Sequence, residues 1–482
     1  MFLTSIIVCS TLTIQMDSSY AEAVPAEFQT LVTETVYNQR LARMHEAADG
    51  VLPEAMIQSA AASPCGECLV AFMEAYALDP LVEETLALVV SGLQHPPAYV
   101  NSANPWSISN SGSALYAQLI STFTDWCTWL PQISGDQDDG LKYIQQVGWL
   151  YYQNQAGVAL VQGRNPRNET EAFSAGFDLF NNFAKERGAF MDSPASTVYV
   201  AQWLNDPRIE IQDYKKQKVS DYVSWNDFFS REITVDTKTK TIPSRPVTLP
   251  ERDYVISAPT DCIVNPLTQY LVKDGQLHRQ YIENPFNFDM ILDIKNTPVN
   301  LSDLLGDVPA NYRDQFIGGT GLSCVLMPNT YHHYHSPVTG TIVYAKELSE
   351  LGTWGYEDFP NWIPPGGNVG RIGTDFGQWS NFDRGVVIIE IEYDNVTGAI
   401  PEKLKGYVAS IPVGLDTIGS VVLDPNIKVG TKVQRGYTRI GSFYYGGSLN
   451  ILLFSKGLVA PVIQTRMGNQ IAIIDVGGLS DN

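Results

Sequence analysis

Residues 440–454 read IGSFYYGGSLNILLF, and this short stretch decides how the C-terminal half must fold. An aromatic run ends at two glycines, and an apolar run of strand length follows Ser448. Such a pattern is typical of a turn that leads into a buried strand. The glycines also permit the close backbone approaches that a serine held against a neighbouring carbonyl needs. Taken alone, however, Gly-Gly-Ser is usually just a hairpin turn.

The β pattern extends over residues 251–482. Short runs rich in Val, Ile and Tyr, at 341–344, 386–393 and 407–412, alternate with turn residues. Within 424–443, glycines separate brief strand-like runs, which favours a compact barrel or sandwich of tight hairpins. We therefore expect a mainly β region with a few helices.

The N-terminal half has a different period. From about residue 25 to 215, apolar side chains recur at helical spacing, and proline pairs and polar clusters separate the segments. The basic, proline-containing stretch 234–250 has no helical period and is typical of a linker or an edge segment. The expected fold class is α+β, with a helical N-terminal domain at 24–215 and a mainly β catalytic domain at 216–482.

Residues 1–23 begin with an apolar run and end in small residues that suit a signal peptidase. No Lys or Arg precedes the run, although a charged start is part of such signals. Two readings stay open: a signal peptide of a secreted or surface protein, or a buried N-terminal segment of a cytoplasmic one.

Charge and cysteine content exclude several classes of protein. Acidic residues outnumber basic ones 52 to 31, and the net charge of -21 repels polyanions, so we expect no nucleic-acid partner. Six cysteines are too few for a disulfide-dense scaffold, and only Cys65 and Cys68 have a suggestive spacing. Because a zinc site needs a second such pair, we expect two helix-packing thiols there and no metal site.

Three of the six histidines fall within residues 331–337, YHHYHSP. In an extended run His333 faces away from its neighbours, and a turn entering the strand is needed to point His332 and His335 into one cleft. The alternative is a metal-binding or merely hydrogen-bonded cluster. Another polar loop, SAPTDC at 257–262, carries Asp261, a residue that most often caps or turns a chain.

Together these three motifs, in this order, resemble the phosphatidylserine decarboxylase family of pyruvoyl enzymes. The family has a Pro-x-Asp-Gly loop, a His-x-x-His-x-Pro segment and a C-terminal Gly-Ser cleavage site. Residues 225–231 with Arg245-Pro246 downstream, and residues 381–384, are also similar to it. The resemblance covers roughly residues 220–460. Two positions depart from the family pattern, because Cys262 replaces its usual Gly and Leu449 its usual Thr.

The resemblance assigns a triad of Asp261, His335 and Ser448, with His332 as a separate decarboxylation acid. In such a triad His335 takes the Ser448 hydroxyl proton while Asp261 fixes its tautomer. The attacked acyl group is the carbonyl of Gly447. The resulting ester eliminates, and hydrolysis leaves a pyruvoyl group derived from Ser448. The chain is thereby cut into 1–447 and 448–482, which remain partners, and a homo-oligomer is compatible with the sequence.

The pyruvoyl cofactor implies decarboxylation of an α-amino carboxylate through a Schiff base, with the ketone as electron sink. A histidine with a pKa near neutrality, His332, then returns a proton to carbon. The substrate is either a free amino acid, such as an aromatic one, or phosphatidylserine in phospholipid biosynthesis. The helical half and the Gly-Gly-Ser form are similar to the fungal tryptophan decarboxylase type. The acidic charge, without a basic amphipathic helix, also favours a free amino acid.

Two alternatives come from other classes of protein. The glycine-punctuated segment around 425–445 also resembles biotinyl and lipoyl carrier modules, which bind without catalysis. Those carriers need a lysine at the hairpin tip, where this chain has Gly446, Gly447 and Ser448. An exported serine hydrolase with Ser448 as nucleophile is the other alternative, and it predicts an uncut chain.

Overall fold

The computed structural model describes the helical region, the segment that follows it and most of the β region. The described residues are 51–93, 105–106, 111–131, 143, 146–147, 149–150, 154–252, 254–273, 276–281, 290–294, 297–326, 329–348, 384–394, 403–415, 421–444, 447–456 and 458. The N-terminal segment 1–23 lies outside these residues, as do residues 381–383 of one family-like motif.

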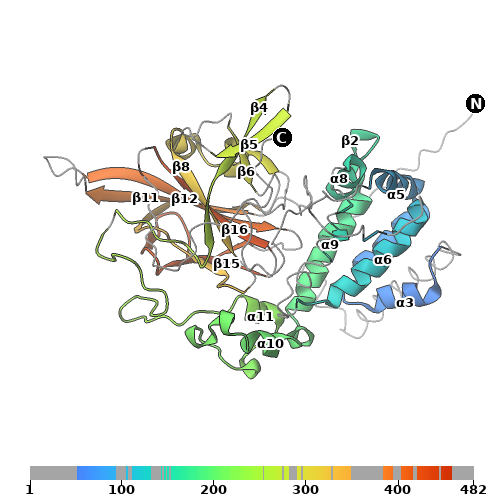
Figure 1. Cartoon of the computed structure of the whole chain (residues 1–482), viewed down its shortest axis with the longest axis horizontal. Helices are drawn as coiled ribbons and strands as arrows, with labels where there is room; N and C mark the ends of the chain where they lie inside the picture. The colour runs from blue at the N-terminus through green and yellow to red at the C-terminus, as the bar shows by residue number, and fades with distance from the viewer. Residues whose placement is uncertain are drawn as a thin grey trace, which may run out of the picture.

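The N-terminal region is a group of helices around one apolar core (Figure 1). Its helices are α3 (Glu54–Ala62), α4 (Gly66–Leu78), α5 (Pro80–Gly92), α6 (Gly112–Thr128), α8 (Gln155–Gln162) and α9 (Ser174–Met191). Asp79 starts α5 by accepting a hydrogen bond from the Leu81 amide, with proline as the first helical residue. The expectation of helices is confirmed, but the region is not purely helical. A small hairpin, β1 (Arg164–Asn165) and β2 (Asn168–Ala172), lies between α8 and α9.

A disulfide links Cys65, which precedes α4, to Cys127 near the end of α6. The prediction that Cys65 is a free packing thiol is therefore wrong, whereas Cys68 is a buried free thiol. The bond joins residues separated by 62 positions, a contact that local spacing does not encode. Within the described residues, no three His, Cys, Asp or Glu side chains gather as metal ligands.

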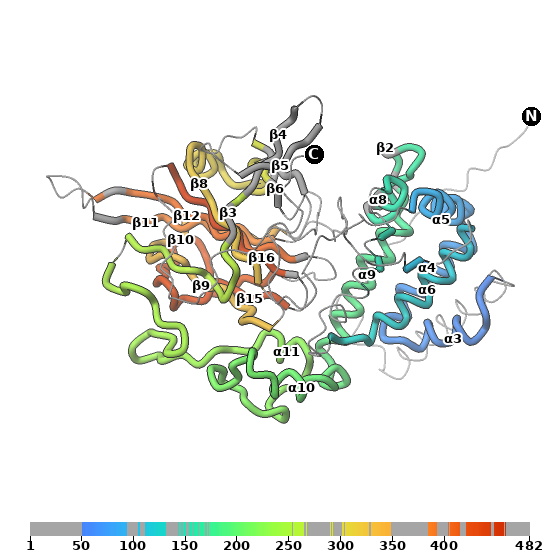
Figure 2. The backbone as a smooth tube through the Cα atoms, in the orientation of Figure 1, coloured from blue at the N-terminus to red at the C-terminus, as the bar shows by residue number. Residues whose placement is uncertain are grey.

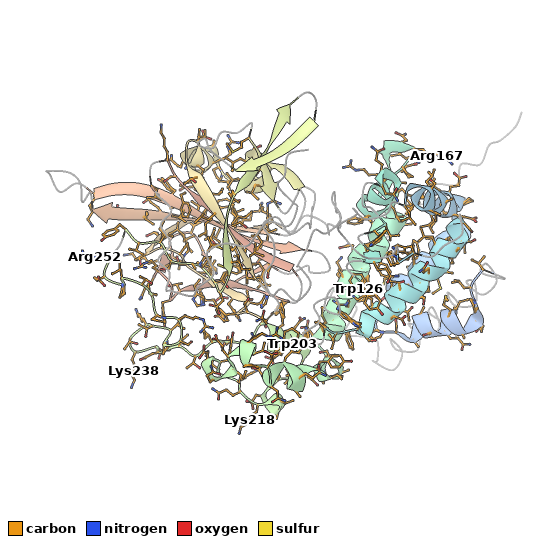
Figure 3. The ribbon with its side chains drawn as sticks, viewed as in Figure 1. Trp126, Arg167, Trp203, Lys218, Lys238 and Arg252 are labelled. Atoms are coloured by element: carbon orange, nitrogen blue, oxygen red, sulfur yellow. A yellow bond between two sulfur atoms is a disulfide. The ribbon has the colours of Figure 1, made fainter. Side chains whose placement is uncertain are left out.

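A winding segment leads from the helices to the sheets, and Figure 2 shows it in green. It contains η1 (Pro194–Thr197), α10 (Val200–Leu204), η2 (Pro207–Ile209), η3 (Ile211–Asp213), η4 (Val219–Asp221) and α11 (Trp225–Phe229). Trp203 belongs to its apolar cluster, separate from the helical core that holds Trp126 (Figure 3). In 234–250 the only strand pairing described is an isolated bridge between Asp236 and Thr241.

The C-terminal region is built from antiparallel sheets. The largest has the order β14-β10-β11-β12-β16-β8-β3. Its strands are β3 (Ile263–Pro266), β8 (Thr320–Leu326), β10 (Gly340–Leu348), β11 (Arg384–Asp394), β12 (Lys403–Leu415), β14 (Lys432–Val433) and β16 (Gly447–Phe454). The strand runs predicted at 341–344, 386–393 and 407–412 lie inside β10, β11 and β12 and are confirmed.

Two smaller sheets and short helices complete this region. One sheet has the order β13-β15-β9 and the other β5-β4-β6-β7. Their strands are β4 (Thr268–Lys273), β5 (Gln276–Tyr281), β6 (Ile291–Ile294), β7 (Thr297–Asn300), β9 (His333–His335), β13 (Val421–Leu423) and β15 (Arg439–Phe443). The helical elements are α12 (Leu301–Leu305), α13 (Ala310–Arg313) and η5 (Asp314–Phe316).

The two strands within 424–443, β14 and β15, do not pair with each other as the predicted tight hairpin. β14 pairs with β10 and β15 pairs with β9, so this segment is shared between two sheets. The prediction was wrong because glycine spacing marks turns but does not name the partner strand.

Strand β16 lies between two apolar clusters. Leu449, Ile451 and Leu453 pack into one cluster, whereas Leu452 and Phe454 pack into the other. Burial on both faces explains why the apolar run after Ser448 does not alternate with polar residues. In the part of the chain that the structure describes, no helix combines the length and apolar character needed to cross a membrane.

Candidate active site

Ser448 is the second residue of β16, inside the largest sheet. It lies opposite Gly414 of β12 and Leu326 of β8, and the preceding Gly447 lies opposite Leu415. Its side chain is 2% exposed, and its hydroxyl oxygen has no hydrogen-bond partner among the described residues. A buried hydroxyl without a partner costs free energy, so such an atom in a native fold calls for a functional explanation.

The histidine segment alternates as an extended chain does. The rings of His333 and His335 both lie against Tyr331, at centroid distances of 5.0 and 5.7 Å. The ring of His332 instead lies against Phe229, 3.8 Å away. Successive side chains of a strand point to opposite faces, and here that rule places His332 and His335 in different surroundings. Among the described residues, these two side chains have no hydrogen-bond or ring partner in common.

His335 has both ring nitrogens in hydrogen bonds. Nδ1 donates to the carbonyl of Tyr437 at 3.0 Å, so Nε2 of the neutral ring accepts from the Tyr331 hydroxyl at 2.9 Å. Burial lowers the pKa of His335 to about 4. Burial also raises the pKa of the Tyr331 hydroxyl, which therefore stays protonated as the donor. As a base for Ser448, His335 must first lose this contact.

His332 has one free nitrogen. Its Nδ1 donates to the carbonyl of Thr330 at 2.9 Å, and its Nε2 is buried with no partner among the residues described. Burial, followed by the charge of Arg231, holds its pKa well below the ordinary value. From the sequence we expected a pKa near neutrality for His332, and this structure does not support that value. In this state the ring is neutral and offers a lone pair at Nε2.

Asp261 contacts an arginine rather than a histidine. Both carboxylate oxygens accept from Nε of Arg245, at 2.9 and 3.0 Å, and Oδ2 also accepts from Nη2 at 2.9 Å. Arg245 further binds Asp213 and Glu210, which makes a small ionic network. The field of Asp261 still reaches His335, where it is a minor upward influence on the pKa.

Backbone contacts hold the Asp261 loop beside the histidine segment. The amide of His335 donates to the carbonyl of Pro259 at 2.7 Å, and Thr260 Oγ1 donates to the carbonyl of Tyr331 at 3.0 Å. The structure thus brings the two predicted motifs together as neighbouring segments. The direct contacts of the triad, from Asp261 to His335 and from His335 to Ser448, do not occur among the described hydrogen bonds.

Cys262, which follows Asp261, lies immediately before β3. A hydrogen bond with the Cys324 thiol and burial raise its pKa well above the ordinary value. The register pairs Val264 with Cys324, so the two cysteines are diagonal neighbours on one face of the strand pair. Both sulfurs are free thiols in this structure, packed into the apolar cluster beside β16.

Sequence patterns did not indicate a functional role for Arg231, Arg245 or Tyr331. The first two lie in stretches whose likeness to the family was noted, which was the only available signal. Tyr331 heads the histidine run and showed no chemical signature of its own. Their roles follow from partners that lie 4 to 99 positions away in the sequence.

Comparison with known proteins places this site in a family. Residues 225–473, more than half of the chain, match the family described as phosphatidylserine decarboxylase. A phosphatidylserine decarboxylase proenzyme of Clostridium perfringens is 25% identical over 292 residues, which span 59% of this chain and 80% of the relative. Decarboxylase iboD of Amanita muscaria is 28% identical over 240 residues, 48% of this chain and 58% of the relative.

The chain therefore belongs to the phosphatidylserine decarboxylase family, and it is a carboxy-lyase. The family match begins at Trp225, the first residue of α11, and includes the Asp261 loop, the histidine segment and Ser448. The helices α3 to α9 precede the matched residues.

Proposed function

We propose that this protein cleaves itself between Gly447 and Ser448, converts Ser448 into a pyruvoyl group, and uses that group to decarboxylate an α-amino acid. The observation that carries the proposal is the Ser448 hydroxyl, which is buried at the start of a central strand and has no hydrogen-bond partner among the described residues. A hydroxyl that makes no hydrogen bond is available to attack the carbonyl that precedes it. The name proenzyme on related family members supports a precursor that is processed.

Self-cleavage uses the residues around Ser448. Oγ attacks the Gly447 carbonyl carbon while a neutral imidazole takes its proton, and the peptide bond becomes an ester. Loss of the Ser448 α-proton then expels the Gly447 carboxylate, and hydrolysis leaves the ketone and ammonia. We assign the base to His335, which becomes available when the Tyr331 hydroxyl moves from its Nε2. Asp261 acts on His335 through its charge and through the loop contact at Pro259.

The strands around the Gly447–Ser448 bond are suited to hold the pyruvoyl group that forms there. The new N-terminus begins a strand held on both sides by β12 and β8, which fixes the position of the group for catalysis. When formed, the pyruvoyl group supplies a ketone that binds the substrate amine and withdraws the electrons left by departing CO2. We assign to His332 the transfer of a proton to the α-carbon, because its Nε2 is the unpaired ring nitrogen of that side chain.

The substrate class we favour is a free amino acid. Phosphatidylserine carries the same reacting amine and carboxylate, so the site chemistry fits both. A net charge of -21 opposes docking on an anionic bilayer, which supports the soluble substrate. No observation on the described residues favours a carrier module or a serine hydrolase over this proposal.

Intact-mass spectrometry of freshly purified protein tests the proposal. We expect a fragment that ends at Gly447 and a second fragment, 448–482, whose N-terminus is blocked by the ketone. Ser448→Ala should remain one chain and release no CO2. Ser442→Ala in β15 is the matched control and should still be cut. A full-length parent with an unmodified serine would overturn the proposed function.

Activity assays then define the substrate. The processed protein should release CO2 from at least one member of a panel of free L-amino acids and give little with phosphatidylserine vesicles. The reverse result would keep the self-processing proposal and reject our choice of substrate.

A further inference from the structure

Arg231 is a buried cation with incomplete hydrogen bonding. Its side chain is 1% exposed, and its Nη2 donates to the carbonyls of Asn329 and Thr330 at 2.7 and 3.1 Å. Nε and Nη1 are buried without a hydrogen-bond partner among the described residues. The guanidinium lies 4.5 Å from the ring centre of Tyr214 and 5.1 Å from that of Phe228. No described carboxylate forms an ion pair with it, so its charge is not neutralised locally.

The same carbonyl joins Arg231 to His332. The Thr330 oxygen accepts from Nη2 of Arg231 and from Nδ1 of His332. This shared acceptor fixes the proton of His332 on Nδ1 and leaves the lone pair on Nε2. A positive charge this close, in a buried setting, opposes a second positive charge on the imidazole.

The other groups that face His332 are few. The Phe229 ring covers one side of the imidazole and carries no charge. The Thr330 carbonyl favours the protonated ring, and His333 opposes it. His333 is itself neutral at pH 7, because burial lowers its pKa to about 4. Arg231 is therefore the one permanent charge among the groups that act on His332 in the described structure.

We propose that Arg231 is a positioning residue that keeps His332 neutral, with its buried Nε2 available to substrate. His332 then takes a proton from the substrate ammonium and returns it to the α-carbon. The inference rests on the proposed function. Protons are conserved in this scheme. The substrate ammonium must lose a proton before its nitrogen can form a bond to carbon, and Nε2 of His332 accepts that proton. After CO2 leaves, the same N–H bond breaks as a C–H bond forms at the α-carbon, and His332 is neutral again.

The charge of Arg231 serves the second half of this transfer. An imidazolium beside an unneutralised guanidinium is a strong acid, so it gives up its proton readily. A histidine that held its proton at neutral pH would have no vacancy for the ammonium proton and would keep the amine in its unreactive form.

Histidine NMR on the uncut Ser448→Ala chain tests the inference without depending on activity. With 13C at the imidazole Cε1 position, a pH titration follows His332 and His335 separately. In the Ser448→Ala chain with Arg231 unchanged, His332 should stay neutral throughout the pH range in which ordinary histidines titrate. Arg231→Gln removes the charge but keeps an amide donor for the Asn329 carbonyl, and it should move the His332 midpoint upward. Arg231→Lys, which restores a cation, should move it back down.

Arg439→Met is the matched control. Arg439 lowers the pKa values of His333 and His335 and is not among the influences on His332. This variant should therefore raise the His335 midpoint and leave His332 in place, the reverse of Arg231→Gln. An unchanged His332 midpoint in Arg231→Gln, or a His332 that already titrates near neutrality with Arg231 present, would overturn the inference. Failure of the parent to cut itself would instead reject the proposed function.

Discussion

Two buried arginines show how the helical region and the candidate active site differ. Arg187 of α9 is fully buried, and each of its three nitrogens has a partner: the Trp126 carbonyl, the Met191 sulfur and the Trp129 carbonyl. Arg231 is almost as buried, yet its hydrogen bonds to described residues come from Nη2 alone. A cation with a partner at every nitrogen serves the fold, whereas a nitrogen left without a described partner calls for a functional explanation.

The same contrast holds for the neighbouring groups. Among the described residues of the helical region, the buried side-chain atoms without a partner are neutral hydroxyls, such as those of Thr85 and Tyr116. Among the described residues, unpaired basic nitrogens occur in Arg231, His332 and His333. Unpaired polar atoms in a low-dielectric interior cost stability, and proteins keep such costs mainly where chemistry requires them.

The largest expected effect comes from His332 itself. His332→Ala should still cut at Gly447 but lose about 10² to 10⁴ in decarboxylation rate, the usual contribution of a positioned proton donor. His333→Asn, at the adjacent buried histidine, is the control and should lose far less. The measurement is CO2 release by cleaved protein, with cleavage checked by gel. If His332→Ala cuts slowly but works normally once cut, the roles of the two histidines are reversed.

Loss of the disulfide in the helical region should lower the free energy of unfolding and leave self-cleavage unchanged. Replacing Cys65 and Cys127 by serine removes a bond across 62 positions, which costs about 4 kcal/mol in a chain-entropy estimate. Urea unfolding followed by circular dichroism measures this loss. Cleavage at Gly447 should proceed as before under native conditions. Cys68→Ala leaves the disulfide intact and should lower the free energy of unfolding by less. A cleavage defect in the folded double variant would contradict the separation of the two regions.

Acid should lower the free energy of unfolding through the buried histidines of the candidate active site. His333 and His335 have folded pKa values of about 4, below the ordinary 6.5, so the unfolded chain binds more protons between these values. Stability is then complete above about pH 6.5 and falls as the pH drops to about 4, by roughly 3 kcal/mol for each histidine. Unfolding of the Ser448→Ala chain at several pH values measures the slope. His333→Asn should reduce it, and an unchanged slope would show that His333 is not buried as described.

The smallest effect is expected at Tyr331. Tyr331→Phe removes the hydroxyl that occupies Nε2 of His335, a hydrogen bond worth about 1 kcal/mol. If His335 is the base for Ser448, freeing its nitrogen should speed self-cleavage about five-fold, since about 1 kcal/mol corresponds to that factor. The time course of cleavage after refolding measures it. Tyr334→Phe, whose hydroxyl contacts the Val422 carbonyl, is the control. Slower cleavage in Tyr331→Phe would mean that the hydroxyl relays the proton.

Local sequence patterns predicted the β strands and singled out Ser448, but they did not predict which side chains contact each other in the site. The apolar run after Ser448 predicts a buried strand, and β16 is buried on both faces. The histidine motif indicated candidate bases, yet it did not show that strand alternation turns His332 toward Phe229 and His335 toward Tyr331. Nor did the Asp261 loop indicate that its carboxylate pairs with Arg245.

By itself, the sequence determined the α+β order of elements, the strand that carries Ser448 and the motifs that resemble the family, because these depend on residues close together in the chain. Only the tertiary structure decided which side chains meet. The Thr330 carbonyl lies 99 positions from Arg231, and Cys127 lies 62 from Cys65. Contacts of that separation arise from packing whole elements together, and periodicity within one element carries no record of its partner.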